Sequence, residues 1–194
     1  MTMPDAAPRP PAPHPPGPRP PAPWRRATQG DVPDMIAIAA IVHTGFPEGA
    51  CVLAERITLH PEGCFVLDAP AGVRPAATGP TDTGVTDKRV RGYLLSHPWR
   101  AGDAPKLNRR LGALPPAPDA YYIHDLALHP AAQGSGAAGA IVAHLLAVTA
   151  GWRLHALVAV NRSAPFWARH GFAVTPGLDL SSYGPDAHYM TRRA

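Results

Sequence analysis

The segment from Tyr121 to Ala150, YYIHDLALHPAAQGSGAAGAIVAHLLAVTA, reads as a strand, a glycine-rich turn and an apolar helix in direct succession. Apolar residues alternate with polar ones up to His129-Pro130, where the proline ends the strand because it cannot donate to a ladder. The small residues from Gln133 to Ala138 then lead into the helix. A turn of this kind at a helix N-terminus presents unpaired backbone N–H groups to a phosphate. The segment therefore predicts a diphosphate-binding loop.

Spacing separates this turn from other phosphate-binding loops. It lacks the lysine of GxxxxGK[ST], and it lacks the acidic residue that follows GxGxxG by about twenty positions. It does contain Gln-x-x-Gly-x-Ala. This pattern resembles the acyl-CoA pyrophosphate loop of the GCN5-related N-acetyltransferases (GNAT). The resemblance implies acetyl-CoA as cosubstrate, bound by Gln133, Gly134, Ser135, Gly136, Ala137 and Ala138.

Composition predicts one folded domain, residues 24–194, preceded by a disordered tail. Residues 1–23 contain eleven of the 26 prolines, which disfavour helices and central strands. The remaining length suffices for a sizeable core. The net charge of +4 is modest and comes from scattered arginines, so no nucleic-acid partner is expected.

Cysteine content and hydropathy predict a cytoplasmic protein. Cys51 and Cys64 are expected to be reduced thiols, because no secretory signal is visible. The longest apolar run, residues 136–150, contains His144 and is shorter than the roughly 20 residues that span a bilayer. We expect no membrane segment and no metal site, and the sequence leaves formation of a homodimer open.

Hydrophobic periodicity and turn residues predict the remaining elements. The expected helices are Val32 to His43, Ala50 to His60, the helix after Gly136, and Ala164 to His170. The expected strands are Trp24 to Thr28, Cys64 to Leu67, Val90 to His97, the strand ending at Leu128, Leu154 to Val160, Phe172 to Val174, and Ala187 to Thr191. Ala69 to Asp87 is predicted to be a hairpin loop, and Pro98 to Asp119 a long connection that forms a substrate wall.

This order of elements resembles the GNAT fold, an α/β (α+β) architecture with a mixed central sheet. A second signature agrees, because NRSAPFWARHGF, residues 161–172, is similar to the family segment Asn-x-x-Ala-x-x-Phe-Tyr-x-x-x-Gly-Phe. The resemblance implies that parallel strands four and five splay apart around the pantetheine arm. The implied contacts to the arm are the backbone of Leu126, Ala127 and Leu128, together with Asn161 and Phe166. Alternatively, Asn161 is only a helix N-cap.

The same resemblance predicts the chemistry and exposes one departure from it. N-acetyl transfer needs a base for the amine and an acid for the leaving thiolate. In many family members the acid is the tyrosine of the Phe-Tyr pair, but Trp167 stands at that position here, and an indole is no acid. Either Tyr183 or Tyr189 replaces it, or water protonates the thiolate.

His124 is the expected general base, because imidazole is mostly neutral near pH 7. The two-residue period of a strand places Tyr122 on the same face as His124, and Asp125 on the opposite face. The segment 124–129 resembles the arylalkylamine N-acetyltransferases, whereas Asp125 is similar to an acidic residue of the glucosamine-phosphate acetyltransferases. Asp125 and Tyr122 are therefore alternative catalytic residues. His124 could instead be a structural histidine bonded to backbone.

Four residues are predicted to line the acceptor pocket: Phe46, Glu48, His97 and Trp99. We expect an acetyl-CoA-dependent N-acetyltransferase that acts on a small-molecule amine. The alternatives are a non-catalytic acyl-CoA-binding module, which the substitution of Trp167 favours, and an enzyme that acetylates a protein N-terminus or lysine.

Overall fold

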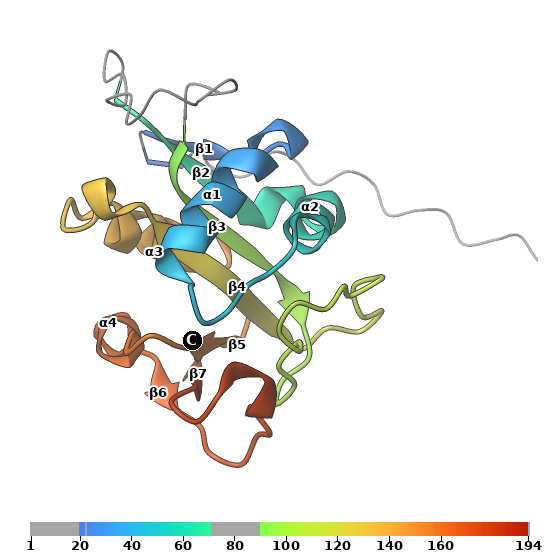
Figure 1. The fold of residues 1–194 in the computed structure, drawn as a ribbon. Coiled ribbons are helices and arrows are strands. Elements are labelled where there is room, and N and C mark those ends of the chain that lie inside the picture. Colours follow the sequence, from blue (N-terminus) through green and yellow to red (C-terminus); the bar gives the residue numbers. More distant parts are fainter. Residues whose placement is uncertain (1–19, 22, 71–89, 194) are drawn as a thin grey trace, which may run out of the picture.

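The computed structural model describes residues 20–21, 23–70 and 90–193, which form a central sheet with helices on both faces (Figure 1). The predicted tail up to residue 19 and most of the predicted hairpin loop lie outside these residues. The strands follow the order β1-β2-β3-β4-β5-β7-β6 in one sheet. They are β1 Trp24–Arg26, β2 Cys64–Asp68, β3 Val90–Trp99, β4 Ala120–Leu128, β5 Leu154–Ala159, β6 Ala173–Val174 and β7 His188–Arg193. The α-helices are α1 Val32–Val42, α2 Ala50–Leu59, α3 Ala137–Val148 and α4 Ala164–Arg169.

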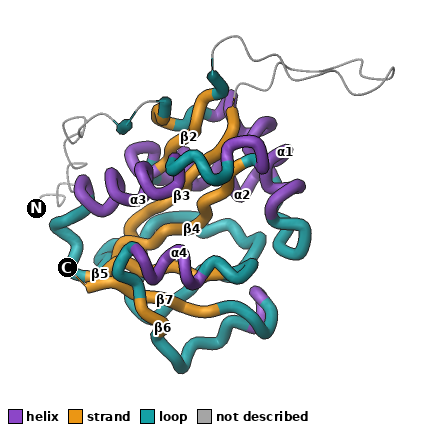
Figure 2. Tube along the Cα trace, turned by 90° about the vertical axis from the view of Figure 1, so that its left-hand side faces the viewer, coloured by secondary structure: helices purple, strands orange, loops and turns teal. Residues whose placement is uncertain are grey.

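The two faces of the sheet carry different helices (Figure 2). On one face, apolar side chains of α3 such as Ile141 and Leu145 pack with Trp167 of α4 against Leu94 and Ile123 of the sheet. On the other face, α1 and α2 are packed on the upper strands through a second cluster. Its members include Met35, Ile38, Leu53, Ile57, Val66, Tyr93 and Leu95. The apolar faces of these helices are therefore the surfaces that pack against the sheet.

The long connection between β3 and β4 is ordered by a buried carboxylate. Glu55 of α2 accepts hydrogen bonds from the backbone N–H groups of Leu111 (2.6 Å) and Gly112 (3.2 Å) and from the Arg110 side chain. The fully buried Arg56 donates to Glu55 and to the Arg109 carbonyl. A buried charge is tolerated only when it is paired in this way. Residues 100–119 of this connection form turns and irregular structure and contain no helix.

Strands β4 and β5 are parallel and separate after a short pairing. Tyr121, Tyr122 and Ile123 pair with His155, Ala156 and Leu157. Beyond Ile123, β4 continues to Leu128 beside β3, but within the described residues it has no further pairing with β5. The predicted divergence of strands four and five is confirmed, and it leaves an opening in the sheet.

A β-bulge in β4 changes the direction of the side chains at this opening. Leu95 pairs with Asp125 and Ser96 pairs with Ile123, so His124 is the extra residue. A bulge places two successive side chains on the same side of a strand. Ile123 belongs to the cluster beneath α3, whereas His124 bonds to Glu48 and Asp125 bonds to Tyr93 and His43. The expectation that Asp125 faces away from His124 is therefore wrong.

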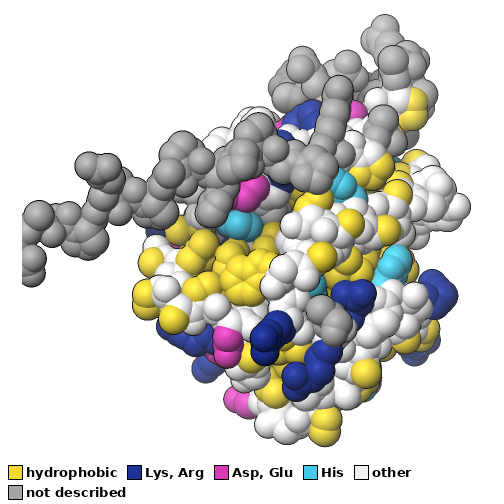
Figure 3. Space-filling view, turned by 180° about the vertical axis from the view of Figure 1, so that it is seen from behind, with side chains coloured by type: hydrophobic (Ala, Val, Ile, Leu, Met, Phe, Trp, Pro, Cys, Tyr) yellow, Lys and Arg dark blue, Asp and Glu magenta, His cyan; other side chains and the backbone are white. Residues whose placement is uncertain are grey.

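Two prolines that precede β1 are hydrogen-bonded to the strands. The Pro21 carbonyl accepts from the Trp24 N–H (2.8 Å), and the Pro23 carbonyl accepts from the Asp68 N–H (3.2 Å). Cys51 and Cys64 are free, and no described helix is long and apolar enough to cross a membrane. The face opposite to that of Figure 1 shows apolar areas beside a group of Lys and Arg side chains and isolated acidic ones (Figure 3). No single sign of charge covers that face.

Candidate functional site

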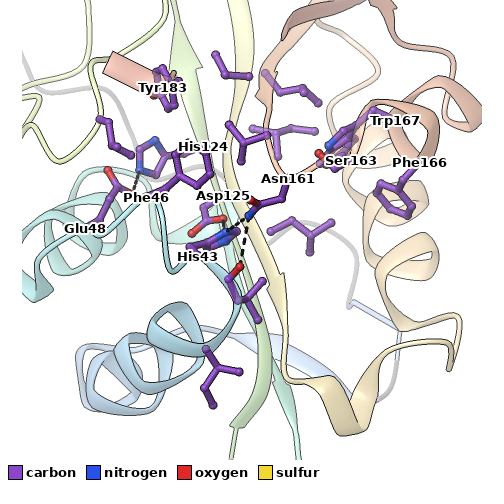
Figure 4. A pocket seen from close by; sticks show the side chains of 18 of the residues that line it. His43, Phe46, Glu48, His124, Asp125, Asn161, Ser163, Phe166, Trp167 and Tyr183 are labelled. Carbon is purple, nitrogen blue, oxygen red and sulfur yellow. Dashed lines mark hydrogen bonds and ion pairs between the residues drawn. The ribbon is translucent and has the colours of Figure 1, made fainter. Parts of the chain in front are cut away.

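A cavity of about 460 Å³ occupies the opening between β4 and β5 (Figure 4). Its walls come from the loop after α1, from β4 and β5, from α4 and from the loops near residues 107 and 183. One end reaches Pro130 and Gln133 beside the glycine-rich turn, and the other end reaches Glu48, His124 and Tyr183. The cavity therefore connects the predicted diphosphate loop with the predicted acceptor residues.

The acceptor end contains a histidine paired with a carboxylate. His124 Nε2 lies 3.0 Å from Glu48 Oε2, and Glu48 Oε1 accepts from the Asn108 N–H at 3.0 Å. The His124 side chain is only 2% exposed, and its Nδ1 has no hydrogen-bond partner among the described residues. When the ring is neutral, Nε2–H donates to the carboxylate and the lone pair is on Nδ1. This geometry leaves His124 an unused proton-accepting atom.

A second histidine–carboxylate pair lies beside the first. His43 caps the C-terminus of α1, and its Nε2 is 2.9 Å from Asp125 Oδ1. The other oxygen of Asp125 accepts from the Tyr93 hydroxyl at 2.5 Å. Asn161 donates to His43 Nδ1 and to the Val42 carbonyl, both at 3.3 Å. His43 thus joins α1, β4 and the loop before α4, as Figure 4 shows.

These contacts determine the charges in the cavity. Burial alone would raise the pKa of Glu48 and of Asp125, but the partner histidines and hydrogen-bond donors outweigh it and lower both pKa values. Burial alone would lower the pKa of His43, but the Asp125 carboxylate outweighs it and raises that pKa. Both carboxylates are therefore ionised at neutral pH, and part of the His43 population is protonated.

The glycine-rich turn has the backbone conformation of an anion-binding loop. Gly134 and Gly136 adopt φ angles of +75° and +82°, which side chains of L-residues rarely adopt. Gly136 is the N-cap of α3, and a Cβ built there meets no atom within 4 Å. Ser135 accepts from the Ala137 N–H and donates to the Ala132 carbonyl. The turn suits a phosphate at the start of α3, because glycine permits close approach to the backbone.

The structure distributes the other predicted cofactor residues unevenly. Leu126, Gln133, Asn161 and Phe166 line the cavity. Ala127 is buried beneath α1, and the Leu128 carbonyl already accepts from Gln133 Nε2 at 3.1 Å. The N-cap of α4 is Ser163, and Asn161 has a left-handed φ of +53°, so the reading of Asn161 as an N-cap is wrong.

The predicted substrate residues divide into two groups. Phe46 and Glu48 line the cavity, and so does Leu107 of the long connection. His97 and Trp99 instead lie in a buried cluster with Tyr122, outside the cavity lining. Tyr122 faces the same side as His124, as predicted, but it is 1% exposed, and its hydroxyl interacts with that of Tyr183.

Sequence reasoning missed His43. Its only local signal is a histidine at the end of a helix before Gly45, which is also the pattern of a simple C-terminal cap. The residues that give it a role, Asp125 and Asn161, lie 82 and 118 positions away. No described group of three or more His, Cys, Asp or Glu residues is arranged to hold a metal ion.

Comparisons with known proteins agree with this geometry. The model of the acetyltransferase (GNAT) family matches residues 46–172. The chain belongs to this family. A search of curated proteins found no match. Members of the family are generally acetyl-CoA-dependent acyltransferases, and the acyl-CoA N-acyltransferase fold is the one described above.

Several solved structures share this fold. The loading GNATL domain of CurA from Lyngbya majuscula has a TM-score of 0.66 at 14% identity, and the match covers 88% of this chain and 96% of that domain. Ard1 from Thermoplasma volcanium has a TM-score of 0.59 at 13% identity, covering 88% and 96%. Naa20 from Chaetomium thermophilum, solved with a bisubstrate analogue, has a TM-score of 0.59 at 14% identity, and the match covers 88% of this chain and 85% of that one. At these identities the likeness of this GNAT protein to them shows the fold alone.

Proposed function

We propose that this GNAT protein transfers the acetyl group of acetyl-CoA to the amine of a small molecule. The observation that carries the proposal is the His124–Glu48 pair at the end of the cavity, beyond the point where β4 and β5 separate. An acyl group carried on an arm between these strands would arrive beside this pair. A general base in such a position raises the rate by about 10²- to 10⁴-fold.

The cofactor would occupy the other half of the cavity. Its diphosphate would bind the backbone N–H groups between Gln133 and Ala138, where the dipole of α3 favours an anion. The arm would run along the unpaired side of β4 near Leu126 and add an edge strand to it. Phe166 and Trp167 of α4 would form the opposite wall.

The base would be His124, with Glu48 fixing its orientation. Glu48 holds the Nε2–H, so the ammonium proton would pass to Nδ1, directly or through one water. The neighbouring carboxylate stabilises the imidazolium that forms. Asp125 already accepts two hydrogen bonds, from His43 and Tyr93, and this makes it the weaker candidate.

A small acceptor is favoured by the enclosure of this end. Phe46 and Glu48 come from the loop after α1, Leu107 from the long connection, and Tyr183 from the last loop. The connection is anchored to α2 through Glu55, and Tyr183 donates to the Pro105 carbonyl. Walls fixed in this way suit a compact amine.

An assay of thiol release from acetyl-CoA, run with a panel of aromatic, aliphatic and polyamine substrates, tests the proposal. We expect release with at least one small amine. Release only with peptide N-termini or peptide lysines would assign the protein to the class of protein acetyltransferases. Calorimetric binding of CoA without release from any acceptor would indicate an acyl-CoA-binding module, which the presence of Trp167 favours as the second candidate.

A further inference from the structure

The site lacks the phenol that would protonate the leaving thiolate at the α4 position. Trp167 stands there, and its indole N–H is no acid. Tyr189 is buried in the cluster around Trp99, outside the cavity lining, and its hydroxyl bonds to the Gly102 N–H. Tyr183 does line the cavity, but its hydroxyl donates to the Pro105 carbonyl at 2.5 Å, and burial raises its pKa. Neither tyrosine is placed to donate its proton.

His43 has what these side chains lack. It lines the cavity, its side chain is 13% exposed, and its Nε2 is held by Asp125 at 2.9 Å. Its Nδ1 contacts Asn161, the residue expected to face the cofactor arm. We propose that His43 is the general acid of the transfer and protonates the sulfur of the departing CoA. This inference rests on the proposed acetyltransferase function.

Acyl transfer with His43 as the acid conserves both protons and electrons. The neutral amine nitrogen attacks the thioester carbonyl, and the C–S bond then breaks with its electron pair moving to sulfur. The proton on His43 Nδ1 passes to that sulfur and gives CoA as a thiol. The nitrogen loses two protons in turn, the ammonium proton before the attack and a second proton as the tetrahedral adduct collapses; His124 accepts each and passes it to solvent. Solvent reprotonates His43, so the transfer from an ammonium substrate releases one proton overall.

The surroundings of His43 favour its protonated form. Asp125 of β4 and Glu48 of the loop after α1 carry the negative charges that act on it, and both raise its pKa against the effect of burial. The C-terminus of α1 adds the negative end of a helix dipole. Asn161 and Tyr93, the other close groups, are uncharged. The charged ring is therefore stable in the cavity.

Protonation also changes the contact with Asn161. In the structure Asn161 Nδ2 donates to the His43 Nδ1 lone pair and to the Val42 carbonyl. An Nδ1–H cannot accept this bond, so the protonated ring must direct its proton to another acceptor. A thiolate at the end of the arm provides that acceptor. When His43 is protonated, the hydrogen bond from Asn161 Nδ2 to His43 Nδ1 is therefore lost.

The variant His43→Gln tests the role, with His188→Gln on the exposed end of β7 as its matched control. With acetyl-CoA and the best amine of the panel, we expect kcat to fall by at least about 100-fold in His43→Gln, with unchanged calorimetric affinity for CoA. In the wild type, kcat should fall at high pH as His43 loses its proton, and this fall should be absent in His43→Gln. Asp125→Asn should move that basic limb to lower pH, because it removes the charge that raises the pKa of His43.

A second substitution separates an acid from a merely positioning residue. Trp167→Tyr places a phenol at the α4 position, and in the His43→Gln background it should restore kcat by at least about tenfold. A residue that only orients Asp125 would not be rescued in this way. An active wild type whose His43→Gln variant stays within about threefold in kcat overturns the inference. The inference is also overturned if His43→Gln lowers kcat but the pH profile keeps its basic limb and Trp167→Tyr does not restore the rate. A wild type that releases no thiol overturns the proposed function itself.

Discussion

The two halves of the cavity are built in different ways. The proposed cofactor half, defined here as residues 126–138, is one continuous stretch in which strand, turn and helix follow each other, and Leu126, Pro130 and Gln133 of this stretch line the cavity. The acceptor half, defined as residues 43–49, 105–112 and 181–183 with His124 and Asp125, comes from separate loops joined by side chains of β4 and α2. The first half depends on backbone conformation, and the second on long-range contacts. Substitutions should therefore affect them independently.

The largest effect is expected in the cofactor half. Gly136→Val should reduce CoA affinity by roughly 100-fold or more, about 2.7 kcal/mol, because a side chain there fills the approach to the backbone N–H groups. Calorimetry with CoA measures this. Gly177→Val is the matched control, because Gly177 also has a left-handed φ, at +96°, and an open Cβ position. Equal CoA affinity in the two folded variants would remove the diphosphate assignment.

In the acceptor half, His124→Ala should lower kcat by at least about 100-fold with little change in CoA affinity. The acidic limb of the rate profile should disappear or move towards the pKa of the amine. His188→Ala, on the exposed end of β7, serves as the control. Near-normal turnover in His124→Ala, combined with a large loss in Asp125→Asn, would transfer the role of base to Asp125.

Removing the anchor of the long connection should affect stability and acceptor binding together. Glu55→Ala leaves the Leu111 and Gly112 N–H groups and the buried Arg56 without their acceptor, so the free energy of unfolding should fall by about 2 kcal/mol. Urea denaturation measures the loss, and KM for the amine should rise while CoA affinity stays constant. Glu62→Ala, at a side chain that is 51% exposed, is the control. A matching loss of CoA affinity would show that the halves are coupled.

Two fully buried histidines that lie outside both halves should make the stability of the whole fold sensitive to acid. Burial lowers the pKa of His97 to about 3, so the unfolded chain binds more protons than the folded one between pH 6.5 and that value. Stability is then fully present above pH 6.5 and falls on acidification, by up to about 1.4 kcal/mol per pH unit for each such histidine. His155, with a pKa lowered to about 4, acts in the same direction. His97→Phe should flatten the dependence of unfolding free energy on pH, and an unchanged slope would contradict this.

The smallest effect is expected from the proline-rich tail. Removal of residues 1–19 should leave the melting temperature and CoA affinity unchanged, because a chain of this composition buries little apolar surface. The truncation stops at residue 19 because the Pro21 and Pro23 carbonyls accept hydrogen bonds from the folded part. A drop of more than a few degrees in a thermal melt would show that the tail is docked.

The amino-acid sequence predicted the fold, which the structure confirms, and the glycine-rich turn that we propose binds the cofactor. The turn can be recognised locally from Gln133, Gly136 and Ala138, because the left-handed φ of residue 136 favours glycine. Hydrophobic periodicity likewise places each helix and strand to within a few residues. The contacts of the proposed acceptor half appear only in the folded structure. A bulge at His124 turned Asp125 towards the cavity, and contacts across 82 and 76 positions paired Asp125 with His43 and His124 with Glu48. Local preferences cannot specify such pairs, because they form only when distant elements are packed against one sheet.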